Sequence, residues 1–162
     1  MMLGQKEIIA RRITQIAKMR AYVVYSSGRM RAAGIAEKNL QQLSDADAEI
    51  LAAFRARFAE YQEHLGKLLK AIALEEGVHV VGITDVLAFA EKAGIIESEQ
   101  DWKEPRDVRN AINHEYEEDT ATLSALATRM LELVEPLVSM NDRAESYCVE
   151  KLGVAVARAG GK

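Results

Sequence analysis

The chain has 162 residues, of which 49% are hydrophobic, and its 21 Lys and Arg against 25 Asp and Glu give a formal net charge of −4. This balance predicts one folded domain and excludes a disordered chain and a globally basic nucleic-acid-binding surface. The single cysteine, Cys148, excludes a disulfide framework and a cysteine-based zinc site. The first residues carry no signal-peptide pattern, and the most apolar stretch, 78–90, is too short to span a bilayer. We therefore expect a cytoplasmic protein with no membrane segment.

Two long amphipathic helices are predicted in the first half of the chain. The first, over about residues 5–40, is interrupted by Gly28 and Gly34, where it is expected to bend or end. The second begins at Ser44 or Asp45 and ends at Gly77. Its apolar residues follow a helical spacing and predict one buried face: Leu51, Phe54, Phe58, Tyr61, Leu65, Leu68 and Ile72.

Shorter helices are predicted to follow. Thr84 or Asp85 is expected to cap a helix that runs through Ala93 and is closed by Gly94. Asp101 is expected to cap a fourth helix, with Pro105 near its first turn, that ends near residue 118.

The last third of the chain is also predicted to be helical. A fifth helix begins near Asp119 or Thr120, Pro136 is expected to kink or end it, and a short sixth helix is predicted over 142–152. The segment VHVVGI, residues 78–83, is the only strand candidate. The pattern predicts an all-α, antiparallel up-and-down bundle of four to five helices. We expect one domain over residues 1–152 and a flexible tail over 153–162.

The fourth predicted helix carries an unusual polar face. At about 100° per residue, Arg109, Asn113 and Tyr116 lie close together, with Asn110 and His114 one stripe further round. A solvated face is usually rich in Lys and Glu, whereas these hydrogen-bonding side chains suit a cleft. The alternative interpretation is an ordinary surface helix with a stray histidine.

This segment resembles HEPN domains, in particular the HepT-type toxins and the related nucleotidyltransferase substrate-binding proteins. Arg109-Asn-Ala-Ile-Asn-His114-Glu-Tyr116 matches the R-x4-H-x-Y pattern of that family. The resemblance extends over about residues 50–123, through Arg57-Phe58, Leu65, 67–69, Thr84-Asp-Val-Leu and Ala93-Gly-Ile-Ile. The interrupted first helix and the long extension after Pro136 depart from the family pattern.

The resemblance implies a HEPN-like bundle that acts as a metal-independent endoribonuclease without a cofactor. Two copies of the fourth helix would meet in a homodimer, because Arg109 and His114 are about 140° apart on one helix. The imidazole would move the proton of a ribose 2′-hydroxyl or of the leaving 5′-oxygen, and Arg109 would bind the phosphate. Asn110 and Asn113 would support these groups, with Asn110 orienting His114 or the RNA.

The resemblance also implies a toxin–antitoxin pair. The partner would be a nucleotidyltransferase antitoxin that attaches AMP to Tyr116, which blocks the cleft by charge and bulk. The alternative is a non-catalytic substrate-binding subunit of a nucleotidyltransferase, and a third possibility is a helical bundle without a site.

Three other features have both a functional and a structural interpretation. The basic residues of the first helix form either a phosphate-contacting strip or a solvated face: Arg11, Arg12, Lys18, Arg20, Arg29 and Arg31. Glu76-x-x-His79 matches half of a di-metal motif, but the second half is missing, and no metal site is predicted. Trp102 is expected to anchor the start of the fourth helix, either in the core or in a dimer interface.

Overall fold

The structure is a computed structural model that describes residues 4–114 and 119–156. Within these two ranges the chain is helical, with no strand. The α-helices are α1 (Gln5–Ala32), α2 (Asp45–Glu75), α3 (Ile83–Lys92), α4 (Gln100–His114) and α5 (Thr120–Leu152), and a short 3-10 helix, η1 (Ile35–Glu37), follows α1. The all-α prediction is confirmed, whereas the strand candidate over 78–83 is a loop that leads into the first residue of α3.

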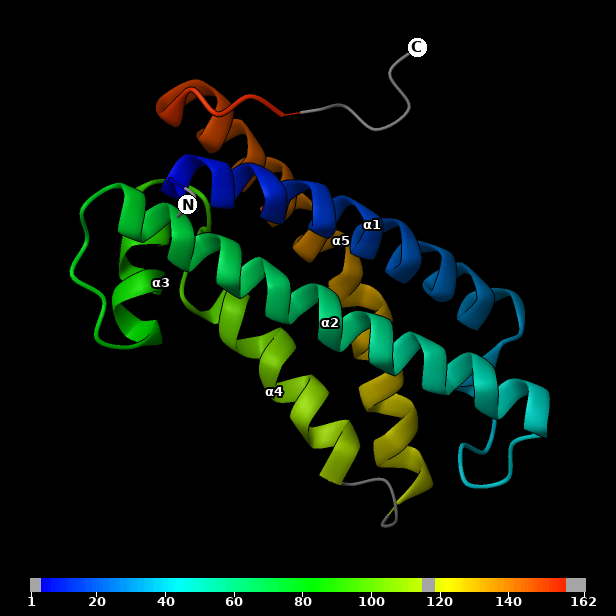
Figure 1. Ribbon diagram of the computed structural model, residues 1–162. Helices are drawn as coiled ribbons and strands as arrows, with labels where there is room; N and C mark the ends of the chain where they lie inside the picture. Colours follow the sequence, from blue (N-terminus) through cyan, green and yellow to red (C-terminus); the bar gives the residue numbers. More distant parts are fainter. Residues whose placement is uncertain (1–3, 115–118, 157–162) are drawn as a thin grey trace.

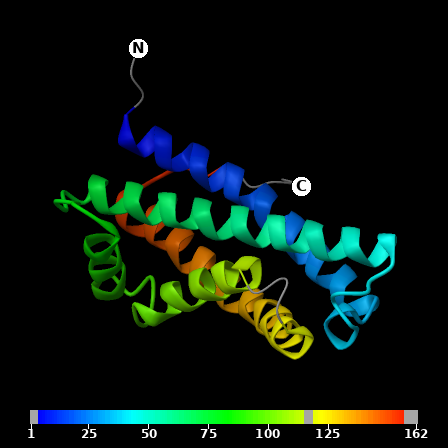
Figure 2. The same cartoon turned by 90° about the horizontal axis from the view of Figure 1, so that it is seen from below.

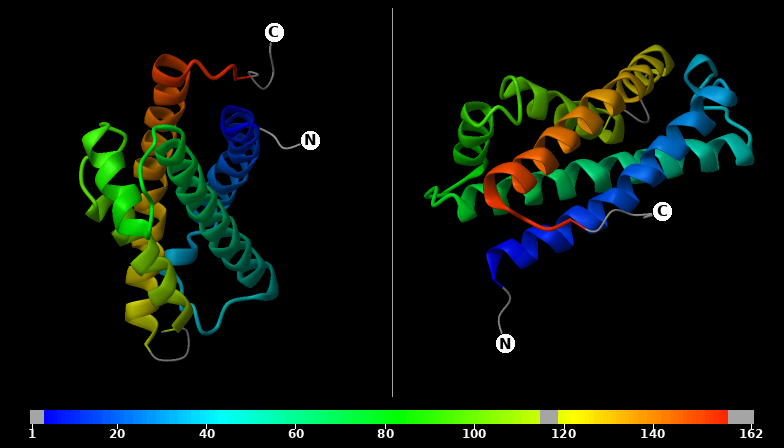
Figure 3. Two further views of the ribbon diagram at one scale, coloured as in Figure 1. Left: turned by 60° about the vertical axis from the view of Figure 1, so that its left-hand side comes forward. Right: turned by 90° about the horizontal axis from the view of Figure 1, so that it is seen from above.

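The four long helices form an antiparallel bundle in which each reverses the direction of the one before it (Figure 1). The most extensive helix contacts join α1 to α2 and α4 to α5, and α5 also packs on α1 and α2. Helix α4 lies on the opposite side of α2 from α1, as seen from below in Figure 2 and from the side in Figure 3. The outer face of α4 is therefore not covered by α1. Among the described residues, no helix is long and apolar enough to cross a membrane.

The predicted apolar stripe of α2 and the apolar residues of α5 lie in the core. Ser44 caps α2 by accepting a hydrogen bond from the Asp47 backbone N–H at 3.2 Å, so the first of the two predicted caps is correct. Every residue of the predicted α2 stripe is buried, as are Leu123, Ala127, Met130, Val134 and Leu137 of α5. One core runs from Ile9 to Val154.

Neither Gly28 nor Pro136 ends its helix. Helix α1 continues through Gly28 and ends before Gly34, whose φ of +62° is the left-handed conformation that glycine adopts easily. Helix α5 continues through Pro136 to Leu152, so the short sixth helix is the second half of α5. Pro136 is exposed, which leaves the carbonyl that loses its N–H donor on the solvent side, where water can replace the donor.

The beginnings of α3 and α4 also differ from prediction. Helix α3 begins after Gly82, and the Asp85 carboxylate accepts hydrogen bonds from the N–H groups of Val81 and Gly82 at 2.8 and 3.2 Å. Helix α4 includes Asp101, whose carboxylate reaches back to the N–H groups of Glu97 and Ser98. Both aspartates stabilise a helix start, but from inside the helix.

Candidate functional site

Helix α4 is held in the bundle by its apolar face. Trp102, Pro105, Val108 and Ile112 recur at helical spacing and are buried. Trp102, only 5% exposed, packs on Gly66 of α2, where a Cβ atom would lie 2.7 Å from the indole Cζ2. Gly66 therefore leaves the space that the indole ring fills, and the prediction that Trp102 anchors α4 is confirmed.

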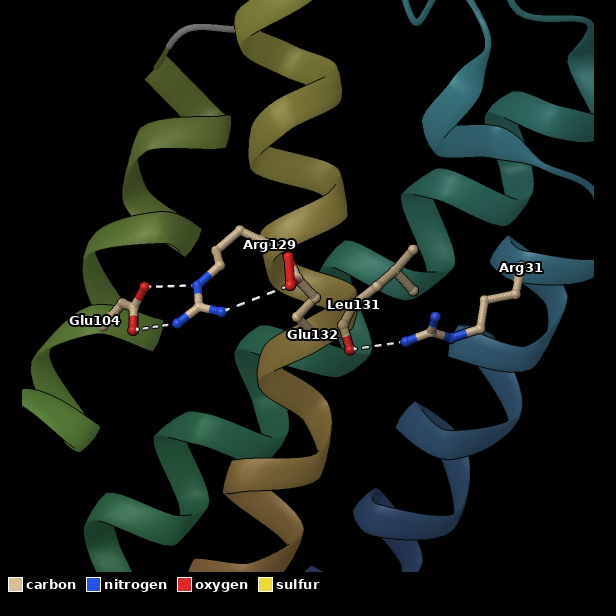
Figure 4. Close-up of polar contacts among 5 residues, drawn as sticks. All are labelled: Arg31, Glu104, Arg129, Leu131 and Glu132. Carbon is tan, nitrogen blue, oxygen red and sulfur yellow. Dashed lines mark hydrogen bonds and ion pairs between the residues drawn. The ribbon is translucent and has the colours of Figure 1, made fainter. Parts of the chain in front are cut away.

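A bidentate ion pair also fixes α4 to α5. The Arg129 guanidinium donates through Nε and Nη2 to the two Glu104 carboxylate oxygens at 2.7 and 2.8 Å (Figure 4). These hydrogen bonds lower the pKa of Glu104 below its usual value, because they favour the charged carboxylate. The pair fixes α4 to α5 five residues before Arg109.

The four described residues of the predicted site lie on the outside of α4. Arg109 is half-buried, and Asn110, Asn113 and His114 are exposed. Arg109 Nη2 lies 3.5 Å from Asn110 Oδ1, and His114 is the last residue of α4 that the structure describes. The fifth predicted residue, Tyr116, lies outside the described residues. The polar face is thus available to a partner and is not used to build the core.

Arg55 of α2 is a neighbour of this face that sequence reasoning missed. Its guanidinium donates through Nη2 to Asn113 Oδ1 and so places a further cation beside the motif of α4. The family resemblance pointed instead to Arg57. This side chain is directed toward α1, stacks on the Tyr22 ring with 4.4 Å between its Cζ atom and the ring centroid, and pairs with Glu60 of its own helix. The two arginines are two residues apart and therefore point about 160° away from each other on α2, toward different neighbouring helices.

A cavity of about 410 Å³ opens where α2, α3 and α4 meet. Five of its thirteen lining residues are valine, isoleucine or tryptophan, and the others include four cationic side chains and one carboxylate. Its lining residues are Gln62, Glu63, Gly66, Lys67, Lys70, Val80, Val81, Gly82, Ile83, Val86, Trp102, Arg106 and Arg109. Of the four described site residues only Arg109 lines it, so this cavity does not contain both Arg109 and His114.

The basic residues of α1 are partly used for packing between helices. Arg20 forms an ion pair with Asp142 of α5 at 2.5 Å, and Arg31 donates to the Leu131 carbonyl at 3.2 Å (Figure 4). Both contacts join α1 to α5, on the side of the bundle away from α4. Arg20 and Arg31 therefore have structural roles, which weakens the interpretation of this strip as a phosphate-contacting surface.

The other histidines lie apart from the face of α4. His64 is half-buried on α2, and His79 is exposed in the loop before α3. Within residues 4–114 and 119–156, no group of three or more His, Cys, Asp or Glu side chains is placed to hold a metal ion.

Comparisons with known proteins add no relative. No family model matches the chain, and neither a curated protein nor a solved structure does.

Proposed function

We propose that the chain is a HEPN-like, metal-independent endoribonuclease whose active site forms when two copies of α4 meet across a two-fold axis. The observation that carries the proposal is the polar face of α4. Arg109, Asn110, Asn113 and His114 lie together on the outer side of a helix whose apolar side is fully used for packing. The R-x4-H-x-Y sequence pattern, which includes Arg109 and His114, adds the resemblance to a nuclease family.

Helix geometry favours a site made by two chains. The five-residue step from Arg109 to His114 turns the side chains about 140° apart, so one helix does not direct both at one phosphate. A two-fold axis beside α4 brings Arg109 of each copy toward His114 of the other. The cavity supports the same conclusion, since it contains Arg109 but not His114.

The proposed reaction is transesterification at an RNA phosphodiester. His114 of one copy removes the proton from the ribose 2′-hydroxyl, and the 2′-oxygen attacks phosphorus. The bond to the 5′-oxygen breaks, and this oxygen takes back a proton from the same His114, whose imidazole gained one from the 2′-hydroxyl. The products are a 2′,3′-cyclic phosphate and a free 5′-hydroxyl. Arg109 binds the non-bridging oxygens as negative charge develops on them.

Asn113 has a positioning role in this proposal. Its side-chain oxygen accepts from Arg55, which places a guanidinium of α2 at the edge of the cleft. Arg55 would neutralise a phosphate next to the scissile one. Asn110, beside Arg109, would orient the RNA or His114.

The resemblance also supports a biological role as the toxin of a pair with a nucleotidyltransferase antitoxin. The antitoxin would attach AMP to the hydroxyl of Tyr116, two residues after His114. The phosphate of the attached AMP would form an ion pair with the Arg109 guanidinium, and the AMP would exclude RNA from the cleft.

The test is cleavage of total RNA by the purified protein in the presence of EDTA. We expect cleavage that resists EDTA, yields 2′,3′-cyclic phosphate ends, and falls at least 100-fold in His114→Ala and in Arg109→Ala, since acid–base and electrostatic contributions of about 10²–10⁴ are typical.

His79→Ala is the matched control, because His79 is also an exposed histidine but lies in the loop before α3. It should cleave RNA like the unchanged protein. Cleavage that persists in His114→Ala would refute the proposal. Absence of cleavage in the unchanged protein, with stable binding to a nucleotidyltransferase, would favour the non-catalytic subunit instead.

A further inference from the structure

The cavity between α2, α3 and α4 has the properties of a small-molecule site. Its volume of about 410 Å³ lies within the range of about 300–1,000 Å³ that ligand pockets occupy. Trp102 and Val86 belong to the buried core and form a fixed part of the wall, since both are at most 5% exposed. Val81, which is 82% exposed, extends the apolar surface to the rim.

The charge around the cavity is predominantly positive. Lys67, Lys70, Arg106 and Arg109 line it, and Glu63 is the one carboxylate in the described lining. The Glu63 carboxylate oxygen Oε1 lies 3.8 Å from Lys67 Nζ and offsets part of the positive charge. A ligand that fills this space therefore needs an anionic group at the rim and an apolar body inside.

Gln62 adds a specific polar requirement. This residue lines the cavity and is only 1% exposed, and its side-chain oxygen Oε1 has no hydrogen-bond partner among the described residues. A buried acceptor without a donor is costly and is usually satisfied by a group that the protein alone does not supply. A donor on the bound ligand would satisfy it.

We propose that this cavity binds a small apolar carboxylate that carries one N–H donor, the chemistry of an N-acylated amino acid. The acyl chain packs against Trp102 and Val86, the carboxylate is held by Lys67 and Lys70, and the amide N–H donates to Gln62. The proposal does not depend on RNA cleavage, since none of these five residues belongs to the proposed catalytic set.

Trp102 provides the measurement, because it is the only tryptophan of the chain and lines the cavity. N-octanoylglycine is titrated into the full-length protein while tryptophan fluorescence is recorded, with melting temperature as a second readout. We expect a saturable fluorescence change and a higher melting temperature. N-octanoylglycinamide, which lacks the charge, and N-octanoylsarcosine, which lacks the N–H, should each bind at least tenfold more weakly. AMP, an anion with a polar body, should do so too.

Variants separate this site from non-specific binding. Lys67→Gln/Lys70→Gln should raise the Kd for N-octanoylglycine at least tenfold. The control Lys6→Gln/Lys92→Gln removes the same charge from exposed positions outside the cavity and should change the Kd less than twofold. Gln62→Leu should abolish the preference for N-octanoylglycine over N-octanoylsarcosine.

Several results would overturn the proposal. They are no saturable change with N-octanoylglycine, equal binding of the uncharged or N-methylated probe, tighter binding of AMP, or an equal loss in the two lysine pairs.

Discussion

At the scale of single residues, close contact across the helix interface explains positions that sequence patterns do not. Gly66 lies in the middle of α2, where glycine is normally unfavourable, and only the structure shows the Trp102 ring above it. Arg55 is another case, since its role beside Asn113 depends on a residue 58 positions away. Buried stripes could be predicted because they follow helical spacing, whereas contacts between separate helices could not.

Gly66→Ala should destabilise the protein even though alanine is the better helix former. The new Cβ would lie 2.7 Å from a rigid, buried ring, and such overpacking costs about 1–3 kcal/mol against a gain of roughly 1 kcal/mol in helix propensity. The change is measured by urea unfolding.

Gly28→Ala is the control within α1. No described atom outside its own helix turn lies within 4 Å of a Cβ at this position, so the substitution should stabilise the protein by about 0.5–1 kcal/mol. Stabilisation of Gly66→Ala by the same amount would show that the indole does not pack on Gly66 as described.

At the scale of secondary-structure elements, the existence of each α-helix was easier to predict than its limits. The helix pattern of α2 is long and regular, and this helix is found, whereas the single helix α5 was predicted as two. The limits depend on which local group satisfies the first N–H groups, as at Asp85 and Asp101, and on whether a proline faces solvent, as at Pro136. Sequence spacing does not contain that information.

The Glu104–Arg129 pair should make the attachment of α4 to α5 sensitive to acid. The folded-state pKa of Glu104 is lowered by its hydrogen bonds to Arg129, so the stabilisation is present above the unfolded pKa of about 4.3 and is lost as pH falls through the folded value. Because the two side chains are 34% and 44% exposed, we expect only about 1 kcal/mol.

Unfolding of Glu104→Gln measures this contribution. The variant should be less stable than the unchanged protein by about 1 kcal/mol at pH 7, and the difference should shrink as the pH is lowered through the folded-state pKa of Glu104. Arg129→Lys keeps the charge but not the bidentate hydrogen bond, so its free energy of unfolding at pH 7 should lie between those of the unchanged protein and Glu104→Gln. An undiminished difference at pH 3 would contradict this assignment.

At the scale of the whole molecule, the bundle presents the polar face of α4 on the side away from α1 and places a cationic cavity beside it. The motif and the all-α class could be predicted from the sequence. The cavity could not, because α2, the loop before α3, and α4 contribute residues that are distant in the chain. For the same reason, the sequence of one chain does not give the position of a second copy in a dimer.

The central claim is that Arg109 of one copy acts with His114 of another. Mixing the Arg109→Ala and His114→Ala proteins, with exchange of subunits, tests it most directly. Half of the resulting dimers carry both variants, and each of these keeps one of the two Arg–His pairs across the interface. The mixture should therefore regain about a quarter of the RNA cleavage of the unchanged protein, while each variant alone is inactive. A mixture that exchanges subunits and stays as inactive as its components would contradict the claim.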